Sequence, residues 1–440
     1  MTDFENNDLA RFGDRDQVDD SNLEKSKQVK SIIKLIAFIV AIVAIGFYTN
    51  SIATIAVIAA LVVIVMVHEL GHFITAKISG MKVTEYFLGF GPRVWSIRKG
   101  ETEYGIKAIP AGGYVRILGM NSLDPVDPAD EPRTFRQSSF PKRIMVAVAG
   151  SFMHFVMAFL LLWSLFSFIG VPNTSKVQIA ALSSFDGRIT PAAQAGLMPG
   201  DLIVAADGHD ITSASELASI VSGSVGKPVS LEISRNGHLI SKTVTPLNAG
   251  EVTISGQPVQ PVGKQPAGVI GVELVAPVQE VNPLAAIGTT FTNMWSYSIE
   301  TISALVSHFS PHGISGYVQQ LQHPSTQINS PGASSRFESP VGIVRLASQA
   351  AQSGAGPVLS LLFSINIFLG IFNLVPLLPL DGGHVIVAVY ERLRSTRHKR
   401  YHVDIMKLMP LTYVVVTLIV LLGATALYLD VTHPLSNPFG

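Results

Sequence analysis

The chain of 440 residues contains no cysteine. Disulfide bonds, thiolate metal sites and cysteine nucleophiles are therefore excluded, and a metal site would have to use histidine and carboxylate side chains. Charged residues are also scarce, at 14% of the chain, whereas soluble domains carry about 25%. Hydrophobic residues make up 48% and the mean hydropathy is +0.40. This combination predicts several membrane-spanning segments.

The chain also lacks a net charge: 31 basic residues balance 31 acidic ones. Without an overall basic field, nucleic acid is not expected as a partner. Residues 1–30 are polar and mixed in charge, with no apolar periodicity, which predicts a disordered cytoplasmic tail. Because this polar segment precedes the first apolar run, we expect no cleavable signal peptide, and that run should stay in the mature protein.

Five apolar stretches are long enough, or nearly so, to cross a membrane as helices of about 20 residues. They comprise residues 32–47, 52–78, 144–169, 358–380 and 411–429. The first stretch is short, so the first two could form one long kinked helix. The polar residues Thr49, Asn50 and Ser51 between them favour a helical hairpin instead.

Lysine and arginine residues cluster at those ends of the apolar stretches that would face the same side of the membrane. They precede or open the first stretch, follow the second, precede the third, and fill residues 392–400, whereas none lies between the first two. By the positive-inside rule, residues 1–30, 80–143 and 392–400 are predicted to be cytoplasmic. Short β-like pieces at 104–109 and 113–117 predict a β-rich segment on that side.

The composition changes to that of a soluble domain over residues 171–281. Apolar residues alternate with polar ones at 229–233, and an Asn-Gly turn follows at 236–237, as in a β-hairpin. Residues 289–309 predict an amphipathic surface helix rather than a span, and the polar residues 311–340 predict a loop. The predicted division is 1–30 tail, 31–170 N-terminal membrane region, 171–281 soluble domain, 282–345 amphipathic helix and loop, and 346–440 C-terminal membrane region.

The strongest chemical signal is the sequence His-Glu-Leu-Gly-His at residues 68–72, inside the second apolar stretch. At 3.6 residues per turn, His68 and His72 lie on one helix face, where they can chelate one zinc ion while Glu69 reaches the water that the metal activates. These residues could instead form hydrogen bonds between helices. Ionisable groups in a bilayer are costly and usually functional, however, which favours the metal site.

A catalytic zinc site needs a third protein ligand, and Asp381 is the candidate. It follows the fourth apolar stretch within residues 373–384, where two prolines break the helix and two glycines permit a tight turn. Counting about 1.5 Å per residue, His68 lies roughly 24 Å along its span, close to the end at which Asp381 is expected. The alternative is a membrane-exit loop in which Asp381 caps a helix.

These motifs together resemble the site-2 protease family of intramembrane zinc metalloproteases, in its bacterial branch that regulates sigma factors through membrane-bound anti-sigma proteins. The H-E-x-x-H motif of the family falls on residues 68–72, and its N-x-x-P-x-x-x-L-D-G pattern falls on residues 373–382. Residues 89–92 and 109–114 resemble the membrane-associated β-loop of the family. The resemblance covers about residues 52 to 430.

The resemblance implies that His68, His72 and Asp381 bind Zn²⁺ and that Glu69 is the general base. Asn373 would orient the substrate backbone or stabilise the oxyanion, although an interhelical hydrogen bond would also explain an amide in an apolar helix. The implied fold is a polytopic α-helical membrane protein of about five spans. The implied substrate is a single-span membrane protein, such as an anti-sigma factor, that another protease has already trimmed.

The chain departs from the family pattern at two places. The first apolar stretch, residues 32–47, is additional to the usual core of the family. Where the family often shows G-P-x-x-N, residues 150–154 are Gly-Ser-Phe-Met-His, so His154 is an intramembrane histidine. We favour a role in helix packing over metal ligation for His154, because three ligands are already assigned.

The soluble segment resembles a bacterial PDZ domain through residues 191–203 and the Asp-Gly pair at 207–208. About 110 residues accommodate one such domain. It would be α+β, would face the outside of the bacterial cytoplasmic (inner) membrane, and could bind an extended chain end by strand addition. We expect it to gate substrates by size, although an inert β-rich spacer is the alternative.

Three classes of function are thus weighed: an intramembrane protease, a metal-ion carrier or sensor, and a PDZ-bearing scaffold with a degenerate catalytic half. A carrier has no need of Glu69 or of a peptide-binding insert. A degenerate protease would have lost at least one of the motif residues, and all are present. The sequence therefore favours the protease, and the substitution Glu69→Gln separates it from the other two.

Overall fold

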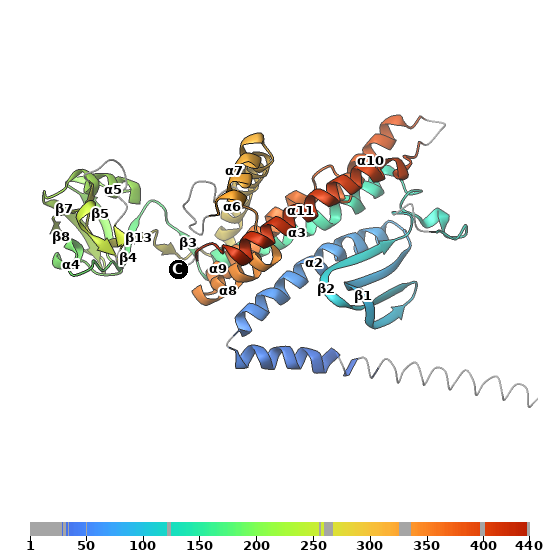
Figure 1. The fold of residues 1–440 in the computed structure, drawn as a ribbon, viewed down its shortest axis with the longest axis horizontal. Coiled ribbons are helices and arrows are strands. Elements are labelled where there is room, and N and C mark those ends of the chain that lie inside the picture. Colours follow the sequence, from blue (N-terminus) through green and yellow to red (C-terminus); the bar gives the residue numbers. More distant parts are fainter. Residues whose placement is uncertain are drawn as a thin grey trace, which may run out of the picture. The chain divides into compact units, whose positions relative to one another are not determined.

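The computed structural model describes residues 29, 32–33, 35–49, 51–120, 125–254, 257–258, 267–324, 336–396 and 401–437. The predicted tail 1–30 lies almost wholly outside the described residues. The chain forms two compact units (Figure 1). One comprises Met1–Ser164 with Ile287–Gly440, and the other comprises Leu165–Ala286.

Four helices of the described residues are long and apolar enough to cross a membrane. They are α2 (Ile52–Ile78), α3 (Phe140–Phe168), α9 (Ala355–Asn373) and α11 (Met409–Thr432). Four of the five predicted spans therefore fall on such helices. The remaining one forms a shorter apolar helix, Leu35–Tyr48, that ends before α2 begins. That it is a separate span stays a prediction.

The fourth predicted span ends earlier than expected. The sequence pattern extends it to Leu380, but helix α9 ends at Asn373, and α10 (Asp381–Arg394) begins after a seven-residue turn. Pro376 and Pro379 cannot donate to a helical hydrogen-bond ladder, which explains the early end. Apolar composition alone does not distinguish this turn from a helix.

A long β-hairpin lies beside α2 in the first unit (Figure 1). It consists of β1 (Val83–Lys99) and β2 (Thr102–Ile117), which pair antiparallel. The pieces predicted at 104–109 and 113–117 both belong to β2. Residues 89–92, which resemble the β-loop of the family, lie in β1, but the rest of β1 was not predicted because its polar residues break the alternation. The hydroxyl of Tyr86 on β1 donates a hydrogen bond of 2.8 Å to the carbonyl of Met66 on α2. The hairpin is followed by a 3₁₀ turn, Glu131–Arg133.

One helix lies inside the segment 311–340 that was predicted to be a loop, and a second begins at its last residue. After α6 (Pro283–His308), which is not among the candidate spans, α7 (Pro311–Gln322) and α8 (Pro340–Ser353) form. Each begins with a serine whose hydroxyl accepts a hydrogen bond from a backbone N–H, followed by a proline at the first helical position. The loop prediction for 311–340 was therefore wrong over 311–322.

Helix α8 packs against α2, α9 and α11 although it is too short to span a membrane. Its anchor is the buried pair of Arg336 and Asp430, 2.8 Å apart, with neither side chain exposed. The other carboxylate oxygen of Asp430 accepts a hydrogen bond of 2.7 Å from the backbone N–H of Ser339, which caps α8. This helix therefore closes the bundle at the C-terminal end of α11.

The second unit is built on a six-stranded sheet in the order β13-β4-β5-β7-β8, with β6 paired to β5. Alternate residues of β7 are buried, as the sequence pattern predicts, and the Asn236-Gly237 turn has the positive φ angles of a tight hairpin. Helix α5 begins with a capping box at Ser213 and Glu216. The elements of this unit are β3 (Val171–Pro172), β4 (Val177–Leu182), α4 (Pro191–Gln194), β5 (Leu202–Ala206), β6 (His209–Asp210), α5 (Ala214–Gly223), β7 (Val229–Arg235), β8 (His238–Val244), β9 (Leu247–Asn248), β10 (Thr253–Ile254), β11 (Gln257–Pro258), β12 (Gly268–Val269), β13 (Val272–Val275) and β14 (Val278–Gln279).

Candidate metal centre

The histidines of the H-E-x-x-H sequence lie on the buried face of α2, which also contains Gly71 and Ala76. His68 is 8% exposed and His72 is 4% exposed. Helix α3 packs closely here, because Gly71 faces the carbonyl of Ala149 with no room for a side chain: a Cβ would lie 2.6 Å from that oxygen. Small residues at this crossing let the two backbones approach.

The first residue of α10 is Asp381, and two glycines that follow it allow the preceding turn to fold back onto the helix. A Cβ on Gly382 would collide with the carbonyls of Leu374 and Val375, and one on Gly383 would lie 2.6 Å from the Leu378 nitrogen. The turn also satisfies its own backbone groups, for example by a bond of 2.9 Å from the Gly383 N–H to the Leu380 carbonyl. Irregular backbone at membrane depth requires such pairing.

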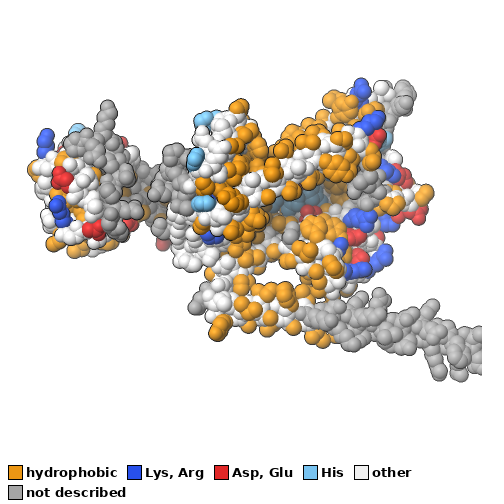
Figure 2. Space-filling model, in the orientation of Figure 1, with side chains coloured by type: hydrophobic (Ala, Val, Ile, Leu, Met, Phe, Trp, Pro, Cys, Tyr) orange, Lys and Arg blue, Asp and Glu red, His pale blue; other side chains and the backbone are white. Residues whose placement is uncertain are grey.

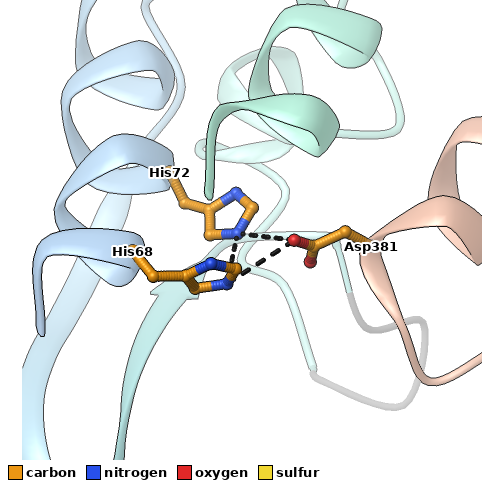
Figure 3. Close-up of side chains that lie close together, drawn as sticks. All are labelled: His68, His72 and Asp381. Atoms are coloured by element: carbon orange, nitrogen blue, oxygen red, sulfur yellow. Dashed lines mark hydrogen bonds and ion pairs between the residues drawn. The ribbon is translucent and has the colours of Figure 1, made fainter. Parts of the chain in front are cut away.

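Figure 3 shows the imidazoles of His68 and His72 and the carboxylate of Asp381 converging from α2 and α10. The Nε2 atoms of the two histidines are 3.3 Å apart, and the Asp381 Oδ2 lies 3.5 Å and 3.3 Å from them. Ligand bonds of about 2.0–2.1 Å in a tetrahedron place ligand atoms about 3.3 Å apart. The three atoms therefore have the spacing of a zinc ligand set.

Two further observations show that the site fits a metal ion. The Asp381 Oδ2 is buried and has no hydrogen-bond partner among the described residues, although it faces both imidazoles. In addition, Gly150 of α3 lies against the two histidines: a Cβ there would collide with the Nε2 of His72 and with the imidazole of His68. The space between the ligand atoms exists because this residue has no side chain.

The Nδ1 of His72 lies 2.7 Å from the carbonyl oxygen of Val146 on α3. A carbonyl only accepts hydrogen bonds, so Nδ1 carries the proton and the lone pair of Nε2 faces the cluster. Such a second contact orients a metal-ligating histidine and makes it more basic. No feature of the sequence identifies this partner.

Glu69 is half-buried between α2 and the β-hairpin. Its Cγ lies 3.3 Å from where a Cβ of Gly113 would be, and its carboxylate is within hydrogen-bonding reach of the Val115 N–H on β2. Nearby, burial raises the pKa of Tyr86 to about 12, with the Glu69 charge as a second cause, so its hydroxyl remains a hydrogen-bond donor at neutral pH. The hairpin therefore holds the carboxylate of Glu69, the residue next to His68 in the sequence, through the backbone of Val115.

Two other residues singled out in the sequence lie outside the three-residue cluster. Asn373 is half-buried at the end of α9, and its catalytic role stays a prediction. His154 is 2% exposed, and its Nδ1 lies 3.0 Å from the Oδ1 of Asn366 on α9. The Nδ2 of Asn366 donates to the carbonyl of Leu362, which leaves its Oδ1 to accept from His154. His154 thus links α3 to α9.

A cavity of about 650 Å³ lies between the β-hairpin and the residues around Asp381. One wall is formed by residues 114–117 of β2, and the opposite wall by Leu378, Pro379 and His384, which flank Asp381 in sequence. Burial and a hydrogen bond to Glu85 raise the pKa of Tyr114, so this wall offers a neutral hydroxyl. The three candidate ligands are not part of the lining, but Val115, which lies within reach of the Glu69 carboxylate, is.

Apolar helices of membrane-spanning length and a buried His-His-Asp cluster define a membrane metallohydrolase. Comparison with known proteins agrees: the sequence model of peptidase family M50 matches residues 56–417. The chain belongs to this family, which is the site-2 protease family that the motifs resemble.

Two mycobacterial relatives cover most of the chain. The zinc metalloprotease Rip1 of Mycolicibacterium smegmatis is 34% identical over 407 residues, which is 86% of this chain and 95% of the relative. Rip1 of Mycobacterium tuberculosis is 32% identical over 403 residues, with the same coverage. A putative zinc metalloprotease of Clostridium perfringens is 28% identical over 330 residues, 75% of this chain and 85% of the relative. The protein is therefore a zinc metalloprotease of the membrane, and its cofactor is Zn²⁺.

Among solved structures, the PDZ domain of the SdrC-like protein from Listeria innocua is 21% identical and covers 22% of this chain and 92% of its own. Its TM-score of 0.17 is too low to carry an argument about the fold of the second unit.

Proposed function

We propose that this protein hydrolyses a peptide bond within or near the transmembrane helix of a single-span membrane protein. The substrate class is that of an anti-sigma factor which another protease has already trimmed, so that the enzyme performs the second cut of regulated intramembrane proteolysis. The observation that carries the proposal is that His68 and His72, inside a helix long enough to span a membrane, meet Asp381, the first residue of α10, in one cluster of candidate ligands.

In this proposal His68, His72 and Asp381 hold the zinc ion. Two neutral imidazoles and one carboxylate are ordinary zinc ligands and leave one coordination position open for catalysis. When bound, zinc acts as a Lewis acid that polarises a carbonyl oxygen and lowers the pKa of water. The hydrogen bond to the Val146 carbonyl fixes the tautomer of His72 and orients its Nε2, and the unpaired Oδ2 of Asp381 faces the same point.

Glu69 is the proposed general base. Its carboxylate adjoins both the cluster and the cavity wall of β2, where it can take a proton from the attacking water and deliver it to the departing amine. Asn373 is proposed to orient the substrate or to stabilise the oxyanion, since an amide can donate to a carbonyl oxygen that gains charge. Both roles require a substrate in the cavity beside residues 114–117.

The second unit is proposed to be an extracytoplasmic PDZ domain that gates substrates. Its support is a groove of about 220 Å³ between Leu217 and Val221 of α5 and residues 268–272. The neighbouring strand β13 is the edge of the sheet, so a peptide could extend the sheet there. The proposed location is the bacterial cytoplasmic membrane, with the metal site near the cytoplasmic side.

The deciding experiment is cleavage of a tagged single-span reporter whose outer domain has been truncated. Wild-type enzyme and Glu69→Gln are purified in detergent, and each is assayed with and without a zinc chelator. We expect wild type to cut within the span and both the substitution and the chelator to stop cutting. Loss of one general base lowers rates by about 10²–10⁴-fold.

Zinc content is measured on the same samples as the control, and Glu69→Gln should retain the metal. Cutting that persists in Glu69→Gln would remove Glu69 as the base. A wild-type enzyme that holds zinc and cuts no truncated reporter would contradict the proposed substrate class.

A further inference from the structure

A second cavity, of about 480 Å³, lies away from the metal cluster, where α3 begins and α10 ends. Its lining includes Arg136, Arg143 and Arg392, together with Ser139 and His402. Figure 2 shows lysine and arginine side chains gathered at this end of the first unit, whereas the flanks of its long helices are hydrophobic. None of these residues has a role in the proposed peptide hydrolysis.

The lining carries three guanidinium groups and a single carboxylate, that of Glu391. That carboxylate is already engaged: one oxygen pairs with Arg143, and the other accepts a hydrogen bond of 2.7 Å from the Val403 N–H. Arg136 pairs with Glu131, but Arg392 forms no ion pair with any residue that the structure describes. Of the three guanidinium groups, that of Arg392 therefore has no counter-charge among the described residues.

Arg143 provides a buried donor without an acceptor. The residue is only 8% exposed, and its Nε has no hydrogen-bond partner in the described part of the chain. Its guanidinium stacks on the ring of Phe135, with Cζ 5.1 Å from the ring centroid, which holds its orientation. Because this Nε is closed off from solvent, it does not reach a ligand in the cavity, and Arg143 contributes to the lining through the rest of its side chain.

The first turn of α3 adds a further attraction for an anion. This 29-residue helix has no acidic residue in its first turn, so the positive end of its dipole is not compensated by a side chain. Ser139, directly before the helix, lines the same cavity. Backbone N–H groups, a hydroxyl and guanidinium groups together are the usual donors to a phosphate.

The position of the cavity favours a lipid headgroup over free phosphate as the ligand. Helix α3 is one of the membrane-length helices, so its first turn lies where a spanning helix meets the headgroup layer. Phe140, Pro141 and Ala388 give the cavity an apolar side. We propose that this cavity binds the phosphate of an anionic phospholipid headgroup, and that the bound lipid ties the start of α3 to the end of α10.

The test uses the full-length enzyme reconstituted in nanodiscs of phosphatidylcholine containing phosphatidylglycerol. After extraction into detergent, retained lipid is counted by native mass spectrometry for wild type and for Arg392→Gln, whose side chain is exposed and whose loss should not unfold the protein. We expect wild type to retain phosphatidylglycerol and the variant to retain about tenfold less, the effect of one lost charge-assisted bond.

The matched control is Arg394→Gln. Arg394 occupies the same last turn of α10 but stacks on Tyr390 and Tyr401 and does not line the cavity, so this variant should retain lipid like wild type. Arg136→Gln serves as the second test variant and should lose lipid like Arg392→Gln. Equal retention by all four proteins, or equal retention of phosphatidylcholine, would overturn the proposal.

A competition arm separates a lipid headgroup from free phosphate. Inorganic phosphate at millimolar concentration is added to the detergent-extracted wild type, and the retained phosphatidylglycerol is counted again. We expect the lipid to remain, because its acyl chains add affinity. Complete displacement by inorganic phosphate would show a free-anion site instead and would contradict the lipid assignment.

Discussion

At the scale of single residues, the metal centre depends on a glycine, because no other residue leaves room for the two histidines. Gly150 of α3 faces the imidazoles of His68 and His72 so closely that a methyl group would collide with their ligand nitrogen atoms. The same turn of α3 supplies the Val146 carbonyl that orients His72. Helix α3 therefore shapes the site although it contributes none of the three candidate ligands.

We predict that Gly150→Ala weakens zinc binding by about 10–100-fold, the usual cost of disturbing the surroundings of a metal ligand. Proteolysis should fall with it. Zinc affinity is measured by competition with a chromogenic chelator, and cleavage is measured on the truncated reporter.

The control for this substitution is Gly423→Ala. Gly423 lies in α11 with open space around its Cα, so the added methyl group meets nothing, and alanine favours a helix over glycine by up to about 1 kcal/mol. This variant should bind zinc and cleave like wild type. A Gly150→Ala protein with unchanged zinc affinity would show that the packing of α3 on α2 yields easily at this point.

At the scale of elements, the β-hairpin is fastened to the end of α2 by Glu101, which lies in the turn between β1 and β2. Its carboxylate accepts hydrogen bonds of 2.7 Å and 3.0 Å from Arg133, and it lies 2.6 Å from the Nζ of Lys77. Mainly through the Arg133 bonds, and then through Lys77, the pKa of Glu101 falls from 4.5 to about 2. The hairpin is thus fixed at the end of α2 that follows the H-E-x-x-H motif.

A carboxyl group whose pKa is lower in the folded state stabilises the fold above its ordinary pKa, and this contribution is lost as the pH falls toward the folded value. We therefore predict that Glu101→Gln lowers stability at pH 7 by about 1 kcal/mol or less, because the group is near the surface. The difference from wild type should shrink between pH 4.5 and 2. Thermal unfolding in detergent across this range measures it.

Glu232→Gln, on an exposed position of β7, is the control for the loss of one carboxylate and should unfold like wild type at every pH. If Glu101→Gln and wild type show the same midpoints at pH 7, the contacts of Glu101 do not hold the hairpin to α2.

At the scale of the whole molecule, the charge distribution predicts that the β-hairpin and the second unit lie on opposite sides of the membrane. Because the natural chain has no cysteine, single cysteines can report this directly. His238 is exposed on β8. We predict that the variant His238→Cys reacts with a membrane-impermeant maleimide on intact cells. Lys99 is exposed at the end of β1, and the variant Lys99→Cys should react only after the cells are permeabilised.

Active cysteine variants are needed for this comparison, so each is first assayed on the reporter. Labelling of both positions from outside would contradict the predicted orientation. Labelling of neither position in permeabilised cells would mean that the sites are covered, and Ser241→Cys and Arg98→Cys then repeat the measurement at neighbouring exposed positions.

Much of the fold follows from local patterns in the sequence. The spans at 52–78, 144–169 and 411–429 fall on α2, α3 and α11 because an unbroken apolar run of that length has one stable form in a bilayer. Errors occur where local composition is ambiguous. The turn after Asn373 is as apolar as a helix, and α7 and α8 are as polar as a loop, so only their capping serines and prolines indicated the true bounds.

The sequence by itself determined the class of metal ligands, through the absence of cysteine, and the placement of His68 and His72 on one helix face, through the helical repeat. Only the tertiary structure brought Asp381, more than 300 residues further along the chain, to 3.3 Å from His72. It alone gave Gly150 and Val146 their places against the imidazoles and paired His154 with Asn366. Such contacts depend on how α2, α3, α9 and α10 pack together, and no periodicity within one helix encodes them.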